Sequence, residues 1–165
     1  MNTSQISLAL KNNAITGPLF RGVFAADTVP ASMAPFPGSC IINTDPSDKP
    51  GAHWIALFQD QENTIESFDS FGKDFGFYGL GNIDLLLNEQ IIKQNDKIQS
   101  DSNSTCGQHC LFLLSRRASG KKYSDIVHLF TSSTVSNDAM VCQYINHHFD
   151  LKTKIRDADF LEQMK

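Results

Sequence analysis

The chain has 165 residues, a length that suits one domain and leaves little room for a second. Hydrophobic residues make up 41% of it, which excludes a disordered or collagen-like chain. The 18 acidic residues outnumber the 14 Lys and Arg, and a net charge of −4 gives no electrostatic support for binding nucleic acid. We therefore expect a single domain over residues 1–165.

Targeting signals and cysteine usage suggest where the protein works. No apolar run approaches the ~20 residues that a membrane span requires, and the N-terminus lacks the pattern of a secretion signal. The 4 cysteines are few for a disulfide scaffold and lack its spacing. These features predict an unexported protein in a reducing compartment, with no membrane partner.

The N-terminal half is predicted to hold a short helix and then strands. Thr3 or Ser4 can cap a helix that runs to Leu10. Four later segments have the length and apolar content of strands, and proline-rich or polar loops separate them. They are residues 20–25, 40–43, 53–58 and 64–68.

The C-terminal half is predicted to be mainly helical. Residues 73–81 are rich in Phe and Gly and are predicted to form a loop, and residues 97–100 have the character of a short strand. The predicted helices cover residues 83–92, 106–120, 124–130, 136–149 and 157–164.

Two polar residues come together in the predicted hairpin. A three-residue turn, Asp60 to Glu62, places His53 directly opposite Asp69. Residues paired in this way have Cβ atoms ~4.5–5.5 Å apart, so the carboxylate can hold one imidazole nitrogen, as nucleophilic catalysis requires. The alternative is a His and an Asp at strand ends with no joint role, and a slip of one residue would put them on opposite faces.

Cys106 is the candidate nucleophile, because polar capping residues precede it and an apolar helix follows it. The helix dipole and a nearby protonated His both favour the thiolate. Gly107 allows another chain or a substrate backbone to approach closely, and the N–H groups of the first helical turn can face a developing oxyanion. Gln99 lies upstream of Cys106, where its side-chain amide can join the same oxyanion site.

The other Cys and His residues are given structural roles. Cys110 is interpreted as a buried packing residue, with a resolving thiol or a metal pair as alternatives. The histidines outside the hairpin could form a zinc site with the two cysteines at 106 and 110, but no second pair of ligands has the spacing of such a site. They are therefore interpreted as surface or capping residues. They are His109, His128, His147 and His148. Trp54 is interpreted as a core residue that also borders the substrate site, and no cofactor or metal is predicted.

These residues stand in segments that resemble the adenovirus endopeptidase (adenain) family. The likeness rests on GAHWIALF at 51–58, FDSFG at 68–72, and CGQHCLFLL at 106–114 with Gln99 before it. It covers most of residues 17–117. More distantly, the same segments resemble the proteases that process ubiquitin-like proteins.

The resemblance implies a cysteine endopeptidase with a Cys-His-Asp triad. Within it, His53 is the general base, Asp69 its orienting acid and Cys106 the nucleophile. Gln99 is the oxyanion donor. The adenovirus enzyme has Glu in place of Asp69. The implied fold is α+β, with a small mixed sheet against helices and the nucleophile at the N-terminus of a central helix.

The resemblance also implies a biological setting. Family members of this size mature capsid precursor proteins in adenoviruses, virophages and Maverick or Polinton transposons. We therefore expect a capsid-maturation protease acting inside the host cell, in the cytoplasm or nucleus, or packaged in virions. The alternatives are a deconjugating protease for ubiquitin-like modifiers and, in another class, a zinc-stabilised interaction module.

Activation of the adenovirus type is not expected. That enzyme is described as activated by DNA and by a disulfide-linked peptide. Here the net charge is −4, and no cysteine lies between Cys40 and Cys106.

Overall fold

The strands form one mixed sheet. The computed structural model describes residues 1–87 and 90–149, and within them the strand order is β1-β2-β3-β4-β5. The strands are β1 Phe20–Phe24, β2 Gly38–Asn43, β3 Trp54–Gln61, β4 Thr64–Phe68 and β5 Gln90–Lys93. β1 and β5 at the edges run parallel to their neighbours, whereas β2, β3 and β4 pair in antiparallel fashion.

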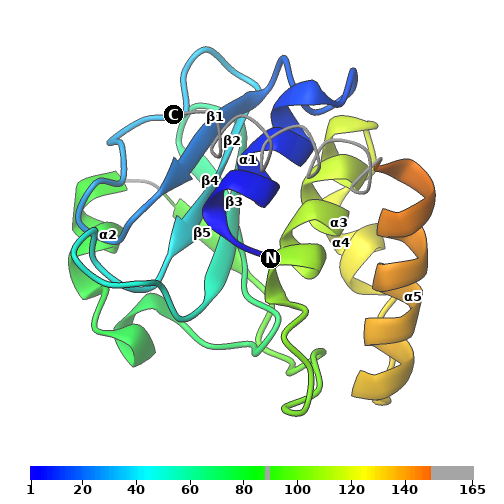
Figure 1. Cartoon of the computed structure of the whole chain (residues 1–165). Helices are drawn as coiled ribbons and strands as arrows, with labels where there is room; N and C mark the ends of the chain where they lie inside the picture. The colour runs from blue at the N-terminus through cyan, green and yellow to red at the C-terminus, as the bar shows by residue number, and fades with distance from the viewer. Residues whose placement is uncertain (88–89, 150–165) are drawn as a thin grey trace, which may run out of the picture.

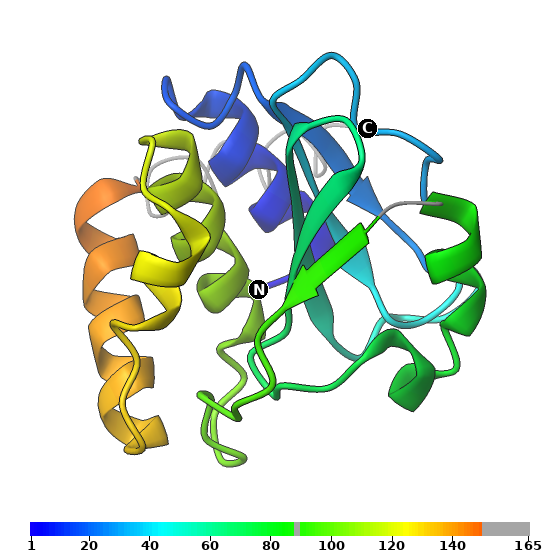
Figure 2. The same cartoon turned by 180° about the vertical axis from the view of Figure 1, so that it is seen from behind.

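Helices cover both faces of the sheet (Figure 1). One face carries α1 Thr3–Asn12, α3 Cys106–Ala118, α4 Tyr123–Val127 and α5 Thr134–His148. The other carries the 3₁₀-helix η1 Phe75–Tyr78 and α2 Gly81–Leu87. Figure 2, from behind, shows α3 between the sheet and α5, so α3 is the central helix of its layer. No described helix combines the length and apolar character needed to cross a membrane.

The apolar run of β3 contributes to both layers of the core. Ala56 and Phe58 belong to the cluster on the α3 side, and Ile55 and Leu57 to the cluster on the α2 side. A strand buried on both faces reads as a continuous apolar run in sequence. Each fully buried large apolar side chain stabilises the fold by ~1.5–3 kcal/mol. β3 is thus a rigid platform for the residue that precedes it, His53.

The β3–β4 hairpin corrects the predicted register. Ala56 pairs with Phe68, whereas the three-residue turn would have paired it with Glu66. The turn itself consists of Glu62 and Asn63, and Asn63 has a φ of 70°. Asn tolerates this left-handed conformation better than most other residues. The strands are therefore displaced by two residues from the predicted pairing.

Two predicted elements near β5 are wrong. The helix predicted over residues 83–92 ends at Leu87, and residues 90–93 form edge strand β5 beside β4. The strand predicted over residues 97–100 is absent: instead, the N–H groups of Ile98 and Gln99 both donate to the carbonyl of Ser70.

Smaller differences occur elsewhere. Residues 75–78 form η1 within the predicted loop. Helix α1 is capped by Asn2, not by Thr3 or Ser4, because Asn2 and Gln5 exchange side-chain and backbone hydrogen bonds in a capping box. The helix predicted over residues 157–164 lies outside the described residues.

Candidate active site

His53 and Asp69 meet at one end of the hairpin. His53 precedes β3 and Asp69 follows β4, and the two side chains are only 7% and 3% exposed. His53 Nε2 lies 2.6 Å from Asp69 Oδ1. The displacement of the hairpin by two residues keeps both side chains on one face, so their contact does not depend on their being directly opposite.

The chain around Asp69 holds its carboxylate in place. Oδ1 also accepts a hydrogen bond from the N–H of Phe71 at 2.9 Å, and Oδ2 accepts one from the N–H of Lys73 at 3.0 Å. Gly72, with a φ of 67°, completes this tight turn. Only glycine adopts that conformation without strain. Backbone N–H groups of the turn after β4 thus surround the ionised carboxylate of Asp69.

Tyr78 is a residue of the site that the sequence prediction missed. Its hydroxyl donates to Asp69 Oδ2 at 2.7 Å, and its ring stacks on His53 with centroids 5.5 Å apart. Tyr78 ends η1, which Asp74 caps by accepting from the N–H of Phe77. The capping character of Asp74 is the sequence signal that could have predicted this helical turn.

Cys106 begins α3 next to His53. The side chain of His53 and the backbone N–H groups of Trp54 and Gly107 lie near its sulfur and lower the pKa of the thiol. Because Nε2 of His53 contacts Asp69, the other ring nitrogen, Nδ1, is the one left for Cys106. The side chains therefore form a line from Asp69 through His53 to Cys106.

The charges in this line stabilise one another. Burial lowers the pKa of His53, but Asp69 and Cys106 outweigh it and raise this pKa to about 9. Burial raises the pKa of Cys106, but the hydrogen bond to His53 and the charge of His53 bring this pKa below its usual value. Burial likewise raises the pKa of Asp69, and its donors bring it below normal. These shifts favour a thiolate–imidazolium pair beside a carboxylate over a neutral thiol and imidazole.

Gln99 lies in the segment that leads to Cys106, and it is buried. Its Oε1 accepts from the Ser70 hydroxyl at 2.6 Å, and its Nε2 donates to the carbonyl of Asn103 at 2.7 Å. A side-chain amide has a second N–H to donate. Ser70 follows Asp69, so Gln99 ties the acid segment to the nucleophile segment. Its role as oxyanion donor stays a prediction.

Gly107 and Trp54 both contact the N-terminal segment. A Cβ on Gly107 would lie 3.2 Å from both Ile6 Cδ1 and Met1 Cβ. The indole Nε1 of Trp54 donates to the carbonyl of Met1 at 3.2 Å. The close approach predicted for Gly107 is therefore made by this chain's own N-terminal segment. The substrate-binding roles of both residues stay predictions.

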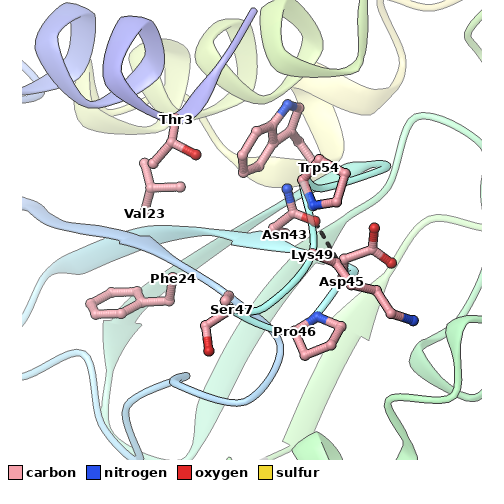
Figure 3. Close-up of a pocket in the computed structure, with 11 residues that line it drawn as sticks. Thr3, Val23, Phe24, Asn43, Asp45, Pro46, Ser47, Lys49 and Trp54 are labelled. Carbon is pink, nitrogen blue, oxygen red and sulfur yellow. Dashed lines mark hydrogen bonds between the residues drawn. The ribbon is translucent and has the colours of Figure 1, made fainter.

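Trp54 lines one part of a surface groove (Figure 3). Val23 and Phe24 of β1 contribute apolar surface, whereas Asn43, Asp45 and other residues of the 45–50 loop contribute polar groups and prolines. Asn43 is fixed in part by accepting from the N–H of Asp45 at 2.8 Å. Trp54 directly follows His53 in the chain, but His53, Asp69 and Cys106 are not among the residues that line the groove.

The other histidines and cysteines are partly as predicted. His128, His147 and His148 are exposed. His109 corrects the prediction: it is fully buried, and its Nε2 lies 2.9 Å from Asp138 Oδ1. The sequence showed a polar residue on an apolar helix, but its partner is far along the chain.

Cys110 is buried, as predicted. Its thiol donates to the carbonyl of Trp54 at 3.4 Å, and burial raises its pKa well above the usual value. None of the four cysteines is in a disulfide. Within residues 1–87 and 90–149, no three His, Cys, Asp or Glu side chains are grouped as a metal site would need.

Comparison with solved structures identifies a protease of similar architecture. The crystal structure of ASFV pS273R protease matches 83% of this chain with a TM-score of 0.56 and 19% sequence identity. The chain therefore shares the fold of that protease. This confirms the α+β class, with a small mixed sheet packed against helices and Cys106 at the start of the central one. The chain spans 63% of the length of that structure.

A second crystal structure, of Se-Met ASFV pS273R protease, matches 63% of this chain and 42% of its own, with a TM-score of 0.41 and 22% identity. No protein-family model matches the sequence. No curated protein matches it either.

Proposed function

We propose that this chain is a cysteine endopeptidase with Cys106 as nucleophile, His53 as general base and acid, and Asp69 as the orienting carboxylate. The observation that carries this proposal is the line of these three side chains, with His53 and Asp69 buried and Cys106 half-buried, in which His53 has a raised and Cys106 a lowered pKa. A thiolate is the nucleophilic form of cysteine, and an adjacent imidazolium can protonate a leaving amine. The adenain-like fold supports the same activity.

The proposed reaction has two halves. The Cys106 thiolate attacks the peptide carbonyl carbon, and the electron pair of the C=O bond moves to oxygen. N–H groups of the first turn of α3 and the Gln99 amide stabilise this oxyanion. As the C–N bond breaks, His53 donates its Nδ1 proton to the leaving amine, which leaves a thioester on Cys106.

Water then completes the cycle. His53 Nδ1 takes a proton from water while the water oxygen attacks the thioester carbonyl. The C–S bond breaks, the acid product leaves, and the thiolate–imidazolium pair returns. Asp69 keeps Nε2–H oriented throughout and stabilises the imidazolium without changing its own protonation.

The groove beside Trp54 supports a peptide substrate. A peptide that lies in it would contact Val23 and Phe24 on one side, the 45–50 loop on the other, and Trp54, which follows His53 in the chain. We propose capsid precursor proteins of a virus or of a Maverick or Polinton element as the substrates, inside the host cell or the virion. This part of the proposal rests on the sequence resemblance.

One assay tests the activity and the substrate together. The purified chain and its Cys106→Ala variant are incubated with capsid proteins encoded beside the gene, and the new termini are mapped. In parallel, both are given a fluorogenic substrate that ends in a ubiquitin-like C-terminus. We expect defined capsid cleavage by the unmodified chain and none by Cys106→Ala.

Other outcomes would change the assignment. Cleavage of the ubiquitin-like substrate alone would identify a deconjugating protease. No cleavage of either, together with an unreactive Cys106 and stoichiometric zinc, would identify an interaction module. The assay therefore separates the two enzyme classes from the binding class.

A further inference from the structure

The segment that precedes Cys106 has no regular secondary structure. Between β5, which ends at Lys93, and α3, which begins at Cys106, the chain forms no helix or strand. Such a segment has no ladder of backbone hydrogen bonds to fix its path. Its position must therefore come from contacts with other elements. Gln99 and Cys106 must be positioned precisely relative to each other if they are to act on the same carbonyl.

A buried carboxylate on α5 supplies these contacts. Asp138 is 3% exposed. Its Oδ2 accepts from the N–H of Ser100 at 3.2 Å and from Asn103 Nδ2 at 2.8 Å. Its Oδ1 accepts from the Thr105 hydroxyl at 2.9 Å and from His109 Nε2 at 2.9 Å. These donors lie on both sides of Cys106 in sequence.

Asn137, the residue before Asp138 on α5, makes a further contact with this segment. Asn137 Nδ2 donates to the carbonyl of Ile98 at 3.1 Å, just before Gln99. Gln99 in turn donates to the carbonyl of Asn103, one of the residues that Asp138 holds. Helix α5 is therefore hydrogen-bonded to this segment at several points, from Ile98 to Thr105.

Asp138 also changes how α3 begins. Thr105 is the N-cap residue of α3; its side chain makes no capping hydrogen bond, and its hydroxyl donates to Asp138. A capping Thr would accept from an N–H group of the first turn. Because the Thr105 side chain does not cap this turn, it leaves the N–H groups of the turn free to bind an oxyanion.

We propose that Asp138 is a positioning residue for catalysis, which holds residues 99–105 and the uncapped start of α3 in the geometry needed to bind the oxyanion. The proposal rests on the proposed endopeptidase function. Asp138 acts through Thr105, Asn103 and Ser100. A buried charge is costly, and an apolar residue in its place is often neutral or stabilising, so a role in positioning explains why a carboxylate stands here.

The test compares Asp138→Asn with Asp125→Asn, which changes an exposed Asp on neighbouring helix α4. An amide has one acceptor oxygen and cannot satisfy the donors that face Asp138. Since a displacement of ~1 Å can cost ~10²-fold, we expect kcat to fall about 10- to 100-fold in Asp138→Asn with KM within about threefold. Asp125→Asn should leave both unchanged.

Alkylation of Cys106 separates positioning from unfolding. Iodoacetamide needs the thiolate but no oxyanion site, so its pH profile on Cys106 should be unchanged in Asp138→Asn. An unchanged kcat would overturn the proposal. A lost kcat accompanied by a shifted alkylation profile would also overturn it, because general unfolding would then be the cause.

Hydrogen exchange gives a readout that needs no turnover. We expect faster exchange over residues 99–107 in Asp138→Asn and unchanged exchange in β3. Identical exchange over 99–107 would reject the proposal even if the chain proved not to be a protease. Should Asp138→Asn fail to fold, Thr105→Val removes one donor to Asp138 and should lower kcat by a smaller factor with the same pattern.

Discussion

At the scale of single residues, Asp69 is the best supported member of the site. Two backbone N–H groups and the Tyr78 hydroxyl fix its carboxylate, in addition to His53. Its orientation therefore does not depend on the imidazole that it orients. A carboxylate held in this way stays ionised and keeps Nδ1 of His53 directed at Cys106.

Removing the Tyr78 hydroxyl should weaken this support. Tyr78→Phe keeps the ring stacked on His53 but removes one donor to Asp69, so we expect kcat/KM to fall about three- to tenfold, as the loss of ~1 kcal/mol would give. Tyr144→Phe is the matched control, because the Tyr144 hydroxyl contacts Ser115 away from the site. Equal effects of the two changes would show that Tyr78 has no special role.

The coupled pKa values predict a bell-shaped pH dependence. His53 is protonated below about pH 9, and Cys106 is ionised above its lowered pKa, so the reactive pair exists between these limits. We expect kcat/KM to rise with pH through the acid limit and to fall as pH passes about 9. The two limits belong to the coupled pair. A steady rise from pH 7 to 10 would mean that a neutral thiol-imidazole site is the resting state.

Much of the site follows from residue types and their order along the chain. His53, Asp69 and Cys106 were predicted because each follows or precedes a clear strand or helix pattern. Tyr78 was missed, since a short helical turn redirects it toward Asp69. His109 was misassigned because its partner Asp138 lies 29 residues away, on another helix, and no local pattern reveals such a contact.

At the scale of secondary structure, the hairpin shows why a wrong register still gave the right contact. Side chains alternate between the faces of a strand, so a displacement of two residues preserves the face. The actual pairing of Ala56 with Phe68 therefore leaves His53 and Asp69 within reach of each other. The error at residues 90–92 has a different cause: their apolar residues fit helical spacing, but β4 offers an edge with which they pair.

The turn after β4 should be sensitive to a methyl group. A Cβ on Gly72 would lie 2.5 Å from the carbonyl oxygen of Asn95, and its φ of 67° is itself unfavourable for Ala. Gly79→Ala is the control, because Gly79 has a φ of 74° but nothing within 4 Å of the added Cβ. Backbone strain alone costs ~1–2 kcal/mol. We expect Gly79→Ala to lose about that much free energy of unfolding in urea titrations, and Gly72→Ala to lose more. Equal losses would mean that the contact with Asn95 relaxes freely.

At the scale of the whole molecule, the site lies where two layers meet. β3 and β4 carry His53 and Asp69, whereas α3 carries Cys106, and α3 packs directly on β3. The proposed catalytic geometry therefore requires the helical layer to be docked on the sheet. Such a contact depends on tertiary packing, which residue order suggests but does not specify.

The overall charge bears on activation. A net charge of −4 leaves few contacts for phosphates, so DNA stimulation should be weak and should fade with salt, as counterion release requires. We expect basal peptide cleavage that is insensitive to DNA at physiological salt and that rises with dithiothreitol, which keeps Cys106 reduced. A DNA-dependent increase above about tenfold, equal to ~1.4 kcal/mol of barrier, would restore activation of the adenovirus type.

The most direct test of the central claim is the competition between thiols for iodoacetamide at pH 6, read by mass spectrometry. Cys142 is the internal comparison, because it is also partly exposed and burial raises its pKa. An ordinary thiol is almost entirely protonated at this pH, so we predict that Cys106 is alkylated at least about tenfold faster. His53→Ala should abolish this preference. If Cys142 reacts as fast as Cys106, or if His53→Ala leaves the Cys106 rate unchanged, the thiolate–imidazolium pair does not exist and the proposed mechanism is wrong.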